Sequence, residues 1–558
     1  MGARLSSLVI IFLLIACQQH QKKEIKSTQE SIPFWEAYDE TEDLQKSKTL
    51  EQERMHLKLI NSRVRDKNKI WEVLNAQMVD FNANRYQELK PVVLDKSIPE
   101  LQESIQQGKL TYTDLVKFYL YRIRKFESDN KLSLNAIISL NEDVIVQANR
   151  LDQSDKSNID KHSVYGMPIL LKDNIDAKGM VTTAGAVVLQ NNQVDKDAYI
   201  TQKLKSQKAL VLGKANLSEW AYFLCAGCPV GYSAIGGQTM NPYGRLVFES
   251  GGSSSGSGAA VAANFCVAAI GTETSGSILS PSSQNSLVGL KPTIGTLSRS
   301  GIVPISSTLD TPGPMTRTVM DNAIVYKAML GKDVDDPASQ QIVYDSFYEK
   351  LSNATLAGKR FGVVKEFLED SLYSRAVSKI KASGGLVFEI EPKQLPLSDF
   401  ITLLSADMKM DLKNYLKTKD EQQVAVFSVT DIRQFNLQDS LQRIPYGQQL
   451  FDGITEDSTS ISQLKSIKKE LERVGRLYFD AFFDTYQLDA VLSINNYHAG
   501  YAAVAKYPAL TVPMGYSAKG EPKGLTFIGQ PFKEDLLLSS AKAFEEVTKY
   551  RVMPEDYR

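Results

Sequence analysis

Histidine, cysteine and excess charge are all scarce in this sequence. Its 558 residues include only four His and four Cys, and 64 Lys and Arg against 65 Asp and Glu leave a net charge of −1. The lack of a basic excess argues against a nucleic-acid partner. Cys225-x-x-Cys228 has no second C-x-x-C or His pair to accompany it, which argues against a zinc site. Two alternatives stay open for this pair, a local disulfide of an oxidising compartment or two free thiols.

The first seventeen residues have the features of an export signal. Arg4 precedes a short apolar run from Leu8 to Ile15, which is too short to span a bilayer. The run ends in Leu14-Ile15-Ala16-Cys17, which resembles the lipobox of bacterial lipoproteins. We therefore expect residues 1–17 to be a lipoprotein-type signal peptide, with Cys17 as the lipid attachment site. The protein would then be exported and anchored to a cell-envelope membrane; the alternative is an ordinary signal peptide that contains a Cys.

Residues 18–95 are predicted to form a helical extension. Apolar residues recur at helical spacing among many charges between Glu40 and Asn84, which predicts one or two long amphipathic helices. This segment would be a stalk from the membrane, a contact within a homodimer, or an extension packed on the main domain.

Residues 96–558 carry the pattern of a large α/β domain. Two helices are predicted within Ile98–Phe126, and short apolar runs typical of buried strands are scattered among helical segments downstream. We expect a single large domain with a central mixed, twisted β-sheet covered by helices on both faces. Residues 340–480 carry no recognisable chemistry and would form a lid or a substrate-side subdomain.

Two loops of small residues stand out, Gly251–Gly258 and Gly271–Ser277. They bracket an apolar segment that predicts a short buried helix followed by a buried strand. The second loop would leave the carboxyl end of that strand, where open α/β sheets place their ligands. Gly258 is followed by Ala259 rather than Lys, which argues against a phosphate-binding loop.

A serine nucleophile in these loops would need a base. His20, His56, His162 and His498 all lie outside serine-rich or strand-end settings, so a His-based triad is disfavoured. Lys172 instead closes a buried strand, where an amine must find a partner or lose its charge. Ser–Lys pairs are a known alternative to the triad. The competing interpretation is a surface Lys172 paired with a nearby Asp, either Asp173 or Asp176.

Several motifs together resemble the amidase signature family. They cover residues from about 95 to the end: Gly166-x-Pro-x-x-x-Lys172-Asp-Asn, Gly-Lys214-x-Asn-Leu-Ser-Glu-Trp, Gly251-Gly-Ser-Ser-x-Gly-Ser, Gly271-Thr-Glu-Thr-x-Gly-Ser277 and Val288-Gly-Leu-Lys-Pro-Thr. The resemblance implies a Ser-Ser-Lys catalytic set without metal or organic cofactor. Lys172 would be the base, Ser277 the nucleophile and Ser253, next to a cis peptide bond, the intermediate serine. The backbone N–H groups of Thr274, Ser275 and Gly276, with Ser277 itself, would form the oxyanion hole.

The resemblance implies a hydrolase that cleaves the C–N bond of a linear amide, with motifs most similar to peptide-amidase members. Ser275, Ile278-Leu279-Ser280 and Glu249 depart from the common family pattern, and we expect these residues at the rim of the substrate pocket. One alternative is a component of a tRNA-dependent amidotransferase for misacylated tRNA, which the export signal argues against. The other is a non-catalytic surface lipoprotein, which the retention of all three catalytic residues argues against.

Overall fold

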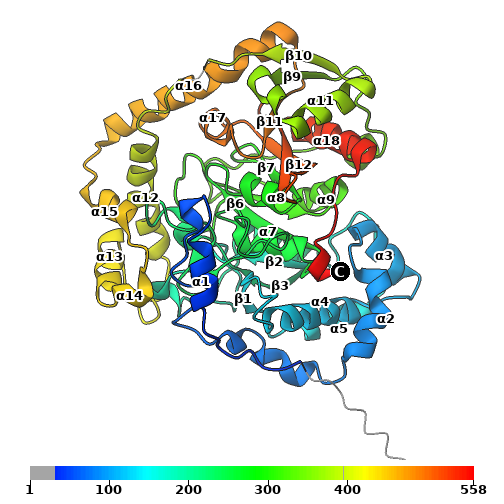
Figure 1. The fold of residues 1–558 in the computed structure, drawn as a ribbon, viewed down its shortest axis with the longest axis vertical. Coiled ribbons are helices and arrows are strands. Elements are labelled where there is room, and N and C mark those ends of the chain that lie inside the picture. Colours follow the sequence, from blue (N-terminus) through cyan, green and yellow to red (C-terminus); the bar gives the residue numbers. More distant parts are fainter. Residues whose placement is uncertain (1–31, 157, 394) are drawn as a thin grey trace, which may run out of the picture.

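One large sheet organises the molecule (Figure 1). The computed structural model describes residues 32–156, 158–393 and 395–558. Eleven strands pair in the order β1-β3-β2-β6-β8-β7-β12-β13-β11-β9-β10, with parallel and antiparallel neighbours. Their bounds are β1 Ile137–Leu140, β2 Pro168–Lys172, β3 Leu210–Ala215, β6 Ala268–Glu273, β7 Val288–Lys291, β8 Thr311–Thr316, β9 Arg360–Val364, β10 Leu386–Ile390, β11 Ala490–Ile494, β12 Ala509–Tyr516 and β13 Pro522–Ile528, beside a small hairpin of β4 Tyr232–Ser233 and β5 Gly237–Gln238.

Helices cover the sheet in two layers. Helices α6, α9, α11 and α18 contact the sheet and join one another, while α7 and α8 pack together against its central strands. The α-helices are α1 Thr41–Ser47, α2 Ala83–Val93, α3 Ile98–Gln106, α4 Tyr112–Glu127, α5 Val144–Asp152, α6 Tyr199–Ser206, α7 Ser255–Ala262, α8 Leu279–Gln284, α9 Val319–Met329, α10 Phe347–Ser352, α11 Ser371–Ala382, α12 Phe400–Leu416, α13 Val429–Leu437, α14 Ser440–Arg443, α15 Gln449–Glu456, α16 Ile461–Tyr486, α17 Ala499–Val504 and α18 Glu534–Thr548. The predicted fold class, a single α/β domain with a mixed sheet between helices, is confirmed.

The prediction of long helices near the N-terminus is wrong. Between residues 40 and 84 the described chain forms only α1 and short 3₁₀ turns, and α2 begins at Ala83. The apolar residues that suggested a helix, among them Leu57, Ile60 and Leu74, are instead buried in the main hydrophobic core. Contact with the body of the protein overrides their helical spacing. The predicted signal peptide, Cys17 and His20 lie outside the described residues.

Strand β8 has the sequence Thr-Pro-Gly-Pro-Met-Thr, with two prolines, which are rare inside a sheet. It lies inside the sheet between β6 and β7. Pro312 and Pro314 are two residues apart, so both direct their missing N–H toward the same neighbour. β6 pairs with residues 311–315 of β8, whereas β7 pairs only with Met315 and Thr316. The prolines are tolerated because that side of the ladder is incomplete.

Helices α12–α15 form a second layer of core beside the sheet, at the left of Figure 1. Their apolar side chains pack on residues 184–224 and 294–309, which include Trp220 and Ile305. This is the segment predicted to be a substrate-side subdomain. Across the part of the chain that the structure describes, no helix combines the length and apolarity required to cross a membrane.

Candidate active site

Lys172 lies at the carboxyl end of β2, in the middle of the sheet. β2 is flanked by parallel neighbours on both sides, β3 and β6, which explains its uninterrupted apolar sequence. The side chain of Lys172 is completely buried. Its Nζ lies 2.7 Å from Ser253 Oγ, 2.9 Å from Thr272 Oγ1 and 3.2 Å from the Thr272 carbonyl oxygen. The predicted base therefore contacts the predicted intermediate serine directly.

Burial favours the neutral form of the Lys172 amine. Loss of water lowers its pKa from the ordinary value of 10.5 to about 7, although the negative charges of Asp310 and Glu273 oppose this change. A lysine with a pKa near 7 can accept a proton at neutral pH, which an exposed lysine cannot do efficiently.

The alternative of a salt-bridged surface lysine does not hold. Asp173 pairs with Lys214 at 3.0 Å, with both side chains fully buried. Asp176 pairs with Lys419 at 2.7 Å. Both carboxylates that could have neutralised Lys172 are thus occupied by other lysines, and the amine faces hydroxyl groups instead.

Ser253 is held in a tightly packed turn before α7. The Gly252–Ser253 peptide bond is cis, as the resemblance implied, and Ser253 is fully buried. Its carbonyl accepts a hydrogen bond from the N–H of Ser218 at 3.0 Å. A Cβ on Gly252 would approach Ser218 Oγ to 2.7 Å, so only glycine fits there. Ser254 hydrogen-bonds to the backbone of Thr272, which gives it a structural task.

Ser277 lies in the second loop and is half-buried. The N–H of Ser254 donates to the Ser277 carbonyl at 3.1 Å, so the backbones of the two Gly/Ser loops meet beside Ser253. The structure therefore brings together all three residues of the predicted Ser-Ser-Lys set, with Lys172 against one serine and Ser277 in the adjoining strand-end loop.

Glu273, which the sequence did not single out, organises this loop. Its carboxylate accepts N–H groups from Gly276 at 2.7 Å, Ile278 at 2.7 Å and Leu279 at 3.0 Å, and only 1% of the residue is exposed. The positive φ of Gly276, 86°, turns its N–H back toward Glu273. This differs from the prediction that the Gly276 N–H faces the substrate.

Two other N–H groups of the predicted oxyanion hole have no hydrogen-bond acceptor among the described residues. They belong to Ser275 and Ser277. Thr274 is fixed through its side chain, whose hydroxyl donates to Asp310 at 2.6 Å. Free N–H groups beside a serine hydroxyl can stabilise a developing oxyanion.

The three histidines within the described residues lie elsewhere. His498 Nε2 bonds to the Tyr478 hydroxyl at 2.8 Å, and its ring stacks on Phe367. His56 bonds to a backbone carbonyl, and His162 stacks on Tyr348. None of the three bonds to a serine, in agreement with the argument against a His-based triad.

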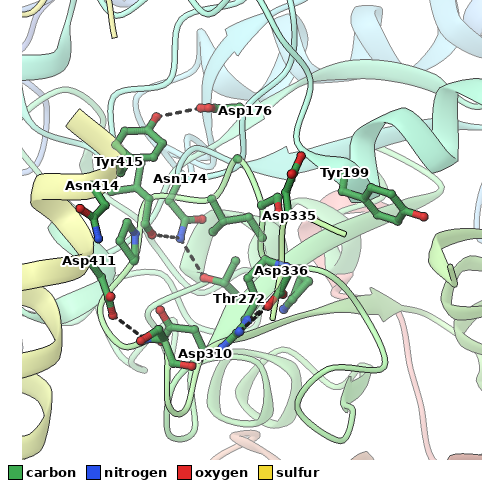
Figure 2. Close-up of a pocket in the computed structure, with 18 of the residues that line it drawn as sticks. Asn174, Asp176, Tyr199, Thr272, Asp310, Asp335, Asp336, Asp411, Asn414 and Tyr415 are labelled. Carbon is green, nitrogen blue, oxygen red and sulfur yellow. Dashed lines mark hydrogen bonds and ion pairs between the residues drawn. The ribbon is translucent and has the colours of Figure 1, made fainter. Parts of the chain in front are cut away.

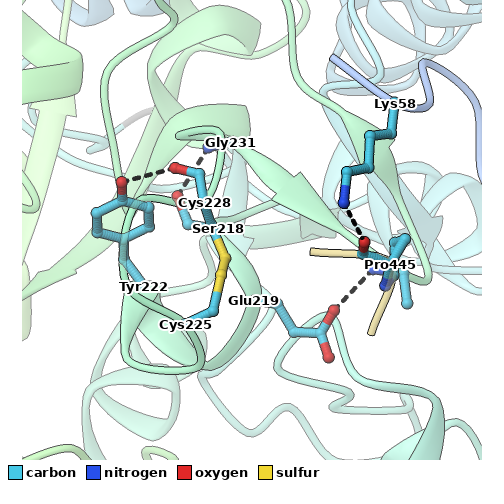
Figure 3. The surroundings of a disulfide bond; sticks show 9 residues. Lys58, Ser218, Glu219, Tyr222, Cys225, Cys228, Gly231 and Pro445 are labelled. Atoms are coloured by element: carbon cyan, nitrogen blue, oxygen red, sulfur yellow. Dashed lines mark hydrogen bonds between the residues drawn. A yellow bond between two sulfur atoms is a disulfide. The ribbon is translucent and has the colours of Figure 1, made fainter. Parts of the chain in front are cut away.

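Cys225 and Cys228 are joined by a disulfide next to this site (Figure 3). The Cys228 carbonyl accepts a hydrogen bond from the Tyr222 hydroxyl at 2.7 Å, and the N–H of Gly231 donates to Ser218 Oγ at 2.8 Å. The N–H of Ser218 in turn donates to the Ser253 carbonyl. The structure thus favours the disulfide over free thiols and places it close to the turn that holds the predicted relay serine.

A cavity of about 770 Å³ adjoins the site (Figure 2). It is lined by Thr272, which contacts Lys172, and by Thr274 of the second loop. The residues expected at the pocket rim do not line it: Ile278 and Leu279 are buried in the core, and Glu249 pairs with Arg54 of the N-terminal segment. The expectation is wrong for Ile278 and Leu279, because the second loop turns inward to join α8, and for Glu249, whereas Ser275 is half-buried in that loop.

Comparisons with known proteins identify the family of this chain. A family model described as Amidase matches residues 114–538. A probable amidase of Arabidopsis thaliana is 35% identical over 483 residues, which cover 83% of this chain and 92% of the relative. An amidase family protein from Bacillus anthracis str. Ames has a solved structure with a TM-score of 0.85 at 34% identity, covering 89% of this chain and 99% of that one.

A solved peptide amidase from Stenotrophomonas maltophilia is also similar. It has a TM-score of 0.77 at 36% identity and covers 83% of this chain and 99% of its own. One component of the glutamyl-tRNA(Gln) amidotransferase of Clostridium botulinum is 30% identical over 82% of this chain and 98% of the relative. With the family model spanning most of the sequence and relatives matched over nearly their full length, the chain belongs to the amidase family and is an amide-hydrolysing enzyme.

Proposed function

We propose that this amidase removes the C-terminal carboxamide of peptides through an acyl intermediate on Ser277, with Ser253 and Lys172 as a proton relay. The observation that carries the proposal is the 2.7 Å contact between Ser253 Oγ and a buried Lys172 whose pKa of about 7 leaves much of the amine neutral. An amine in this state needs no histidine or metal ion to activate a serine.

The contacts of Lys172 suit a neutral amine, which has two N–H donors and one lone pair. Thr272 offers a carbonyl oxygen, which can only accept, and a hydroxyl oxygen, so both N–H groups have acceptors. The lone pair is then left for the hydroxyl proton of Ser253. Ser253 can pass this proton to Lys172 as it takes one from Ser277.

The reaction proceeds in two halves. Ser277 Oγ attacks the amide carbon, and the proton it loses reaches Lys172 through Ser253. As the tetrahedral intermediate collapses, Ser253 protonates the leaving nitrogen, the C–N bond breaks and ammonia departs. Water then attacks the acyl-Ser277 ester through the same relay, which yields the free carboxylic acid and regenerates Ser277.

The N–H groups of Ser275 and Ser277, with Thr274, would receive the oxyanion. Each such donor contributes about 2.7–4 kcal/mol to transition-state stabilisation in serine hydrolases. Glu273 holds the adjoining peptide groups in a fixed orientation, so the donors do not have to reorganise during the reaction.

A peptide substrate is supported by the similarity to a peptide amidase and by the adjoining cavity of about 770 Å³. Cavities that hold ligands of several hundred daltons have volumes of about 300–1,000 Å³. The cavity begins beside Thr272 and Thr274, so a peptide could fill it while its terminal amide reaches Ser277.

The test measures ammonia released from short peptide amides by the purified enzyme and labels it with a fluorophosphonate probe. The wild type should release ammonia and carry one probe molecule on Ser277; Ser277→Ala and Ser253→Ala should lose turnover. Ser255→Ala is the matched control, since its buried hydroxyl in the same loop has no partner among the described residues. Full turnover by Ser277→Ala, with correct folding by circular dichroism, would disprove the assignment.

We also propose that the enzyme is exported and anchored through a lipid on Cys17. The sequence Leu14-Ile15-Ala16-Cys17 supports this, and the Cys225–Cys228 disulfide is typical of an oxidising compartment. Mass spectrometry of the N-terminal peptide from the membrane fraction should find Cys17 acylated. Cys17→Ser should move activity to the soluble fraction, and an unmodified Met1 on the membrane-bound protein would contradict the proposal.

A further inference from the structure

The cavity beside the active site has strongly acidic walls. Its lining carries three basic side chains, Lys196, Arg299 and Lys419, and eight aspartates: Asp176, Asp195, Asp197, Asp310, Asp333, Asp335, Asp336 and Asp411. Figure 2 shows several of these aspartates around the same hollow. A hollow with such an excess of one charge concentrates ligands of the opposite charge.

Ion pairs account for only part of this charge. Asp176 pairs with Lys419 at 2.7 Å, Asp336 with Arg299 at 2.5 Å, and Asp197 with Lys205 at 2.7 Å. The other five aspartates have no ion-pair partner within the described chain: Asp195, Asp310, Asp333, Asp335 and Asp411. Lys196 is the one lining cation without an ion pair among the residues that the structure describes, and Arg299 also acts on Asp310 and Asp411 at longer range, so the lining keeps an excess of negative charge.

Asn174 is an independent sign of a ligand-binding site. It lines the cavity, is only 2% exposed, and its side-chain oxygen has no hydrogen-bond partner among the described residues. Its amide nitrogen donates to Thr272 Oγ1 at 3.0 Å and to the Val303 carbonyl at 3.4 Å. Since a carbonyl only accepts, the nitrogen must face Val303 and the free atom is the oxygen. A buried acceptor of this kind calls for an N–H donor.

Asp411 is fixed at the wall rather than free to turn away. It lies on α12, whose apolar face belongs to the second core, and it accepts the N–H of Ser307 at 2.6 Å. Loss of water raises the pKa of the Asp411 carboxyl, and the neighbouring Asp407 raises it further. A positively charged ligand beside Asp411 would offset both the repulsion from Asp407 and the loss of water around the carboxylate.

The arrangement suits an organic cation better than a metal ion. No group of three or more His, Cys, Asp or Glu side chains among the described residues converges closely enough to hold a metal. The carboxylates are instead spread over the walls of the cavity, where they can accept hydrogen bonds from the several N–H groups of an ammonium or a guanidinium group.

We propose that this cavity binds the positively charged part of the substrate, and that the enzyme therefore selects amides with an ammonium or guanidinium group on the acyl side over neutral amides and over those that carry a carboxylate. The proposal rests on the amide hydrolysis proposed above. Asn174, Asp335 and Asp411 would be its specificity-determining residues.

The experiment compares acetylated dipeptide amides with Arg, citrulline or Glu at each of the two positions. Citrulline has the shape of Arg without the charge. For one position at least, kcat/KM should be about ten- to a hundredfold higher with Arg than with citrulline, and lower again with Glu. Asp411→Asn should narrow the Arg-to-citrulline ratio severalfold. Asp345→Asn is the matched control, because Asp345 is exposed and does not line the cavity; it should leave the ratio unchanged.

The outcomes separate the two proposals. If the Arg, citrulline and Glu amides are hydrolysed at equal rates at both positions, the selection for cations is refuted while the amidase function stands. If no amide is hydrolysed, the proposed function fails, and a binding measurement tests the cation site by itself. Acetyl-argininamide should raise the melting temperature of the Ser277→Ala enzyme, and acetyl-citrullinamide should not. Adding Asp411→Asn should remove the difference between the two compounds. Equal shifts by both compounds would refute the cation site.

Discussion

The protonation of Lys172 should set the pH dependence of this enzyme. With a pKa of about 7, about half of the Lys172 amine is neutral at pH 7 and about 1% at pH 5. An exposed lysine with a pKa of 10.5 would be about 0.03% neutral at pH 7, so burial increases the active form more than a thousandfold. We expect kcat/KM to rise with pH through about 7 and to fall about fiftyfold between pH 7 and pH 5.

The assay is ammonia release from a neutral peptide amide at substrate concentrations far below KM, between pH 5 and pH 9. Lys172→Met should lower kcat/KM by about 10²–10⁴-fold at pH 7, the range for loss of a general base. Its residual activity should lack the acid limb, which is the fall of kcat/KM from pH 7 to pH 5. A wild-type profile that rises only near pH 10, or an acid limb retained by Lys172→Met, would refute the assignment of the base.

Asp310 supplies the control, because burial raises the pKa of its carboxyl to about 6 and it could titrate in the same range. The negative charge of Asp310 raises the pKa of Lys172, so Asp310→Asn should move the acid limb to lower pH if the limb belongs to Lys172. If the limb belongs to Asp310, the same substitution removes it. The two origins are therefore distinguishable with one variant.

Three further predictions concern stability. The folded-state pKa of Lys172 lies below its unfolded value, so the buried amine destabilises the protein most below pH 7 and no longer does so above pH 10.5. In urea unfolding, the free energy of unfolding of Lys172→Met relative to that of the wild type should therefore fall by about 4 kcal/mol between pH 7 and pH 10.5. Glu273→Gln should cost about 1–3 kcal/mol and lower kcat more than it raises KM, since an amide cannot accept all three N–H groups; unchanged kcat would contradict its positioning role. Replacing Cys225 and Cys228 by Ala should cost about 2 kcal/mol, the chain-entropy value for so short a loop, and scanning calorimetry that shows no loss would refute this stabilising role of the disulfide.

Regular patterns made much of the fold predictable from the sequence. The two helices predicted within Ile98–Phe126 are observed as α3 and α4, and the short apolar runs downstream form buried strands of the sheet. Each of these elements has a sequence whose local preference agrees with its final environment. The N-terminal segment was mispredicted because long-range contacts decided its structure: Leu57 and Ile60 are buried by the main core. Strand β8 also depends on its neighbours, since its prolines are accommodated by an incomplete ladder.

The site was predictable only where a motif marked it. Lys172 and Ser253 are 81 residues apart in sequence, and only the family resemblance indicated that they meet. Glu273 had a local signal, a glutamate at the end of a buried strand before a Gly/Ser loop, whose carboxylate had to find donors. The acidic cavity had none, because its aspartates come from distant segments of the chain that α12 and the loops bring together.

Lys172 and Lys214 show why burial alone does not identify a base. Both lie at or near the carboxyl end of adjacent parallel strands, and both are completely buried. The register pairs Lys214 with Leu171, one position before Lys172, so the two side chains leave opposite faces of the sheet. On one face Lys214 meets the carboxylate of Asp173 and forms a buried ion pair that keeps its charge. On the other, Lys172 meets the hydroxyls of Ser253 and Thr272, which can exchange a proton with it but cannot neutralise a charge. The face on which each lysine emerges, rather than its burial, decides that one is structural and the other is available for catalysis.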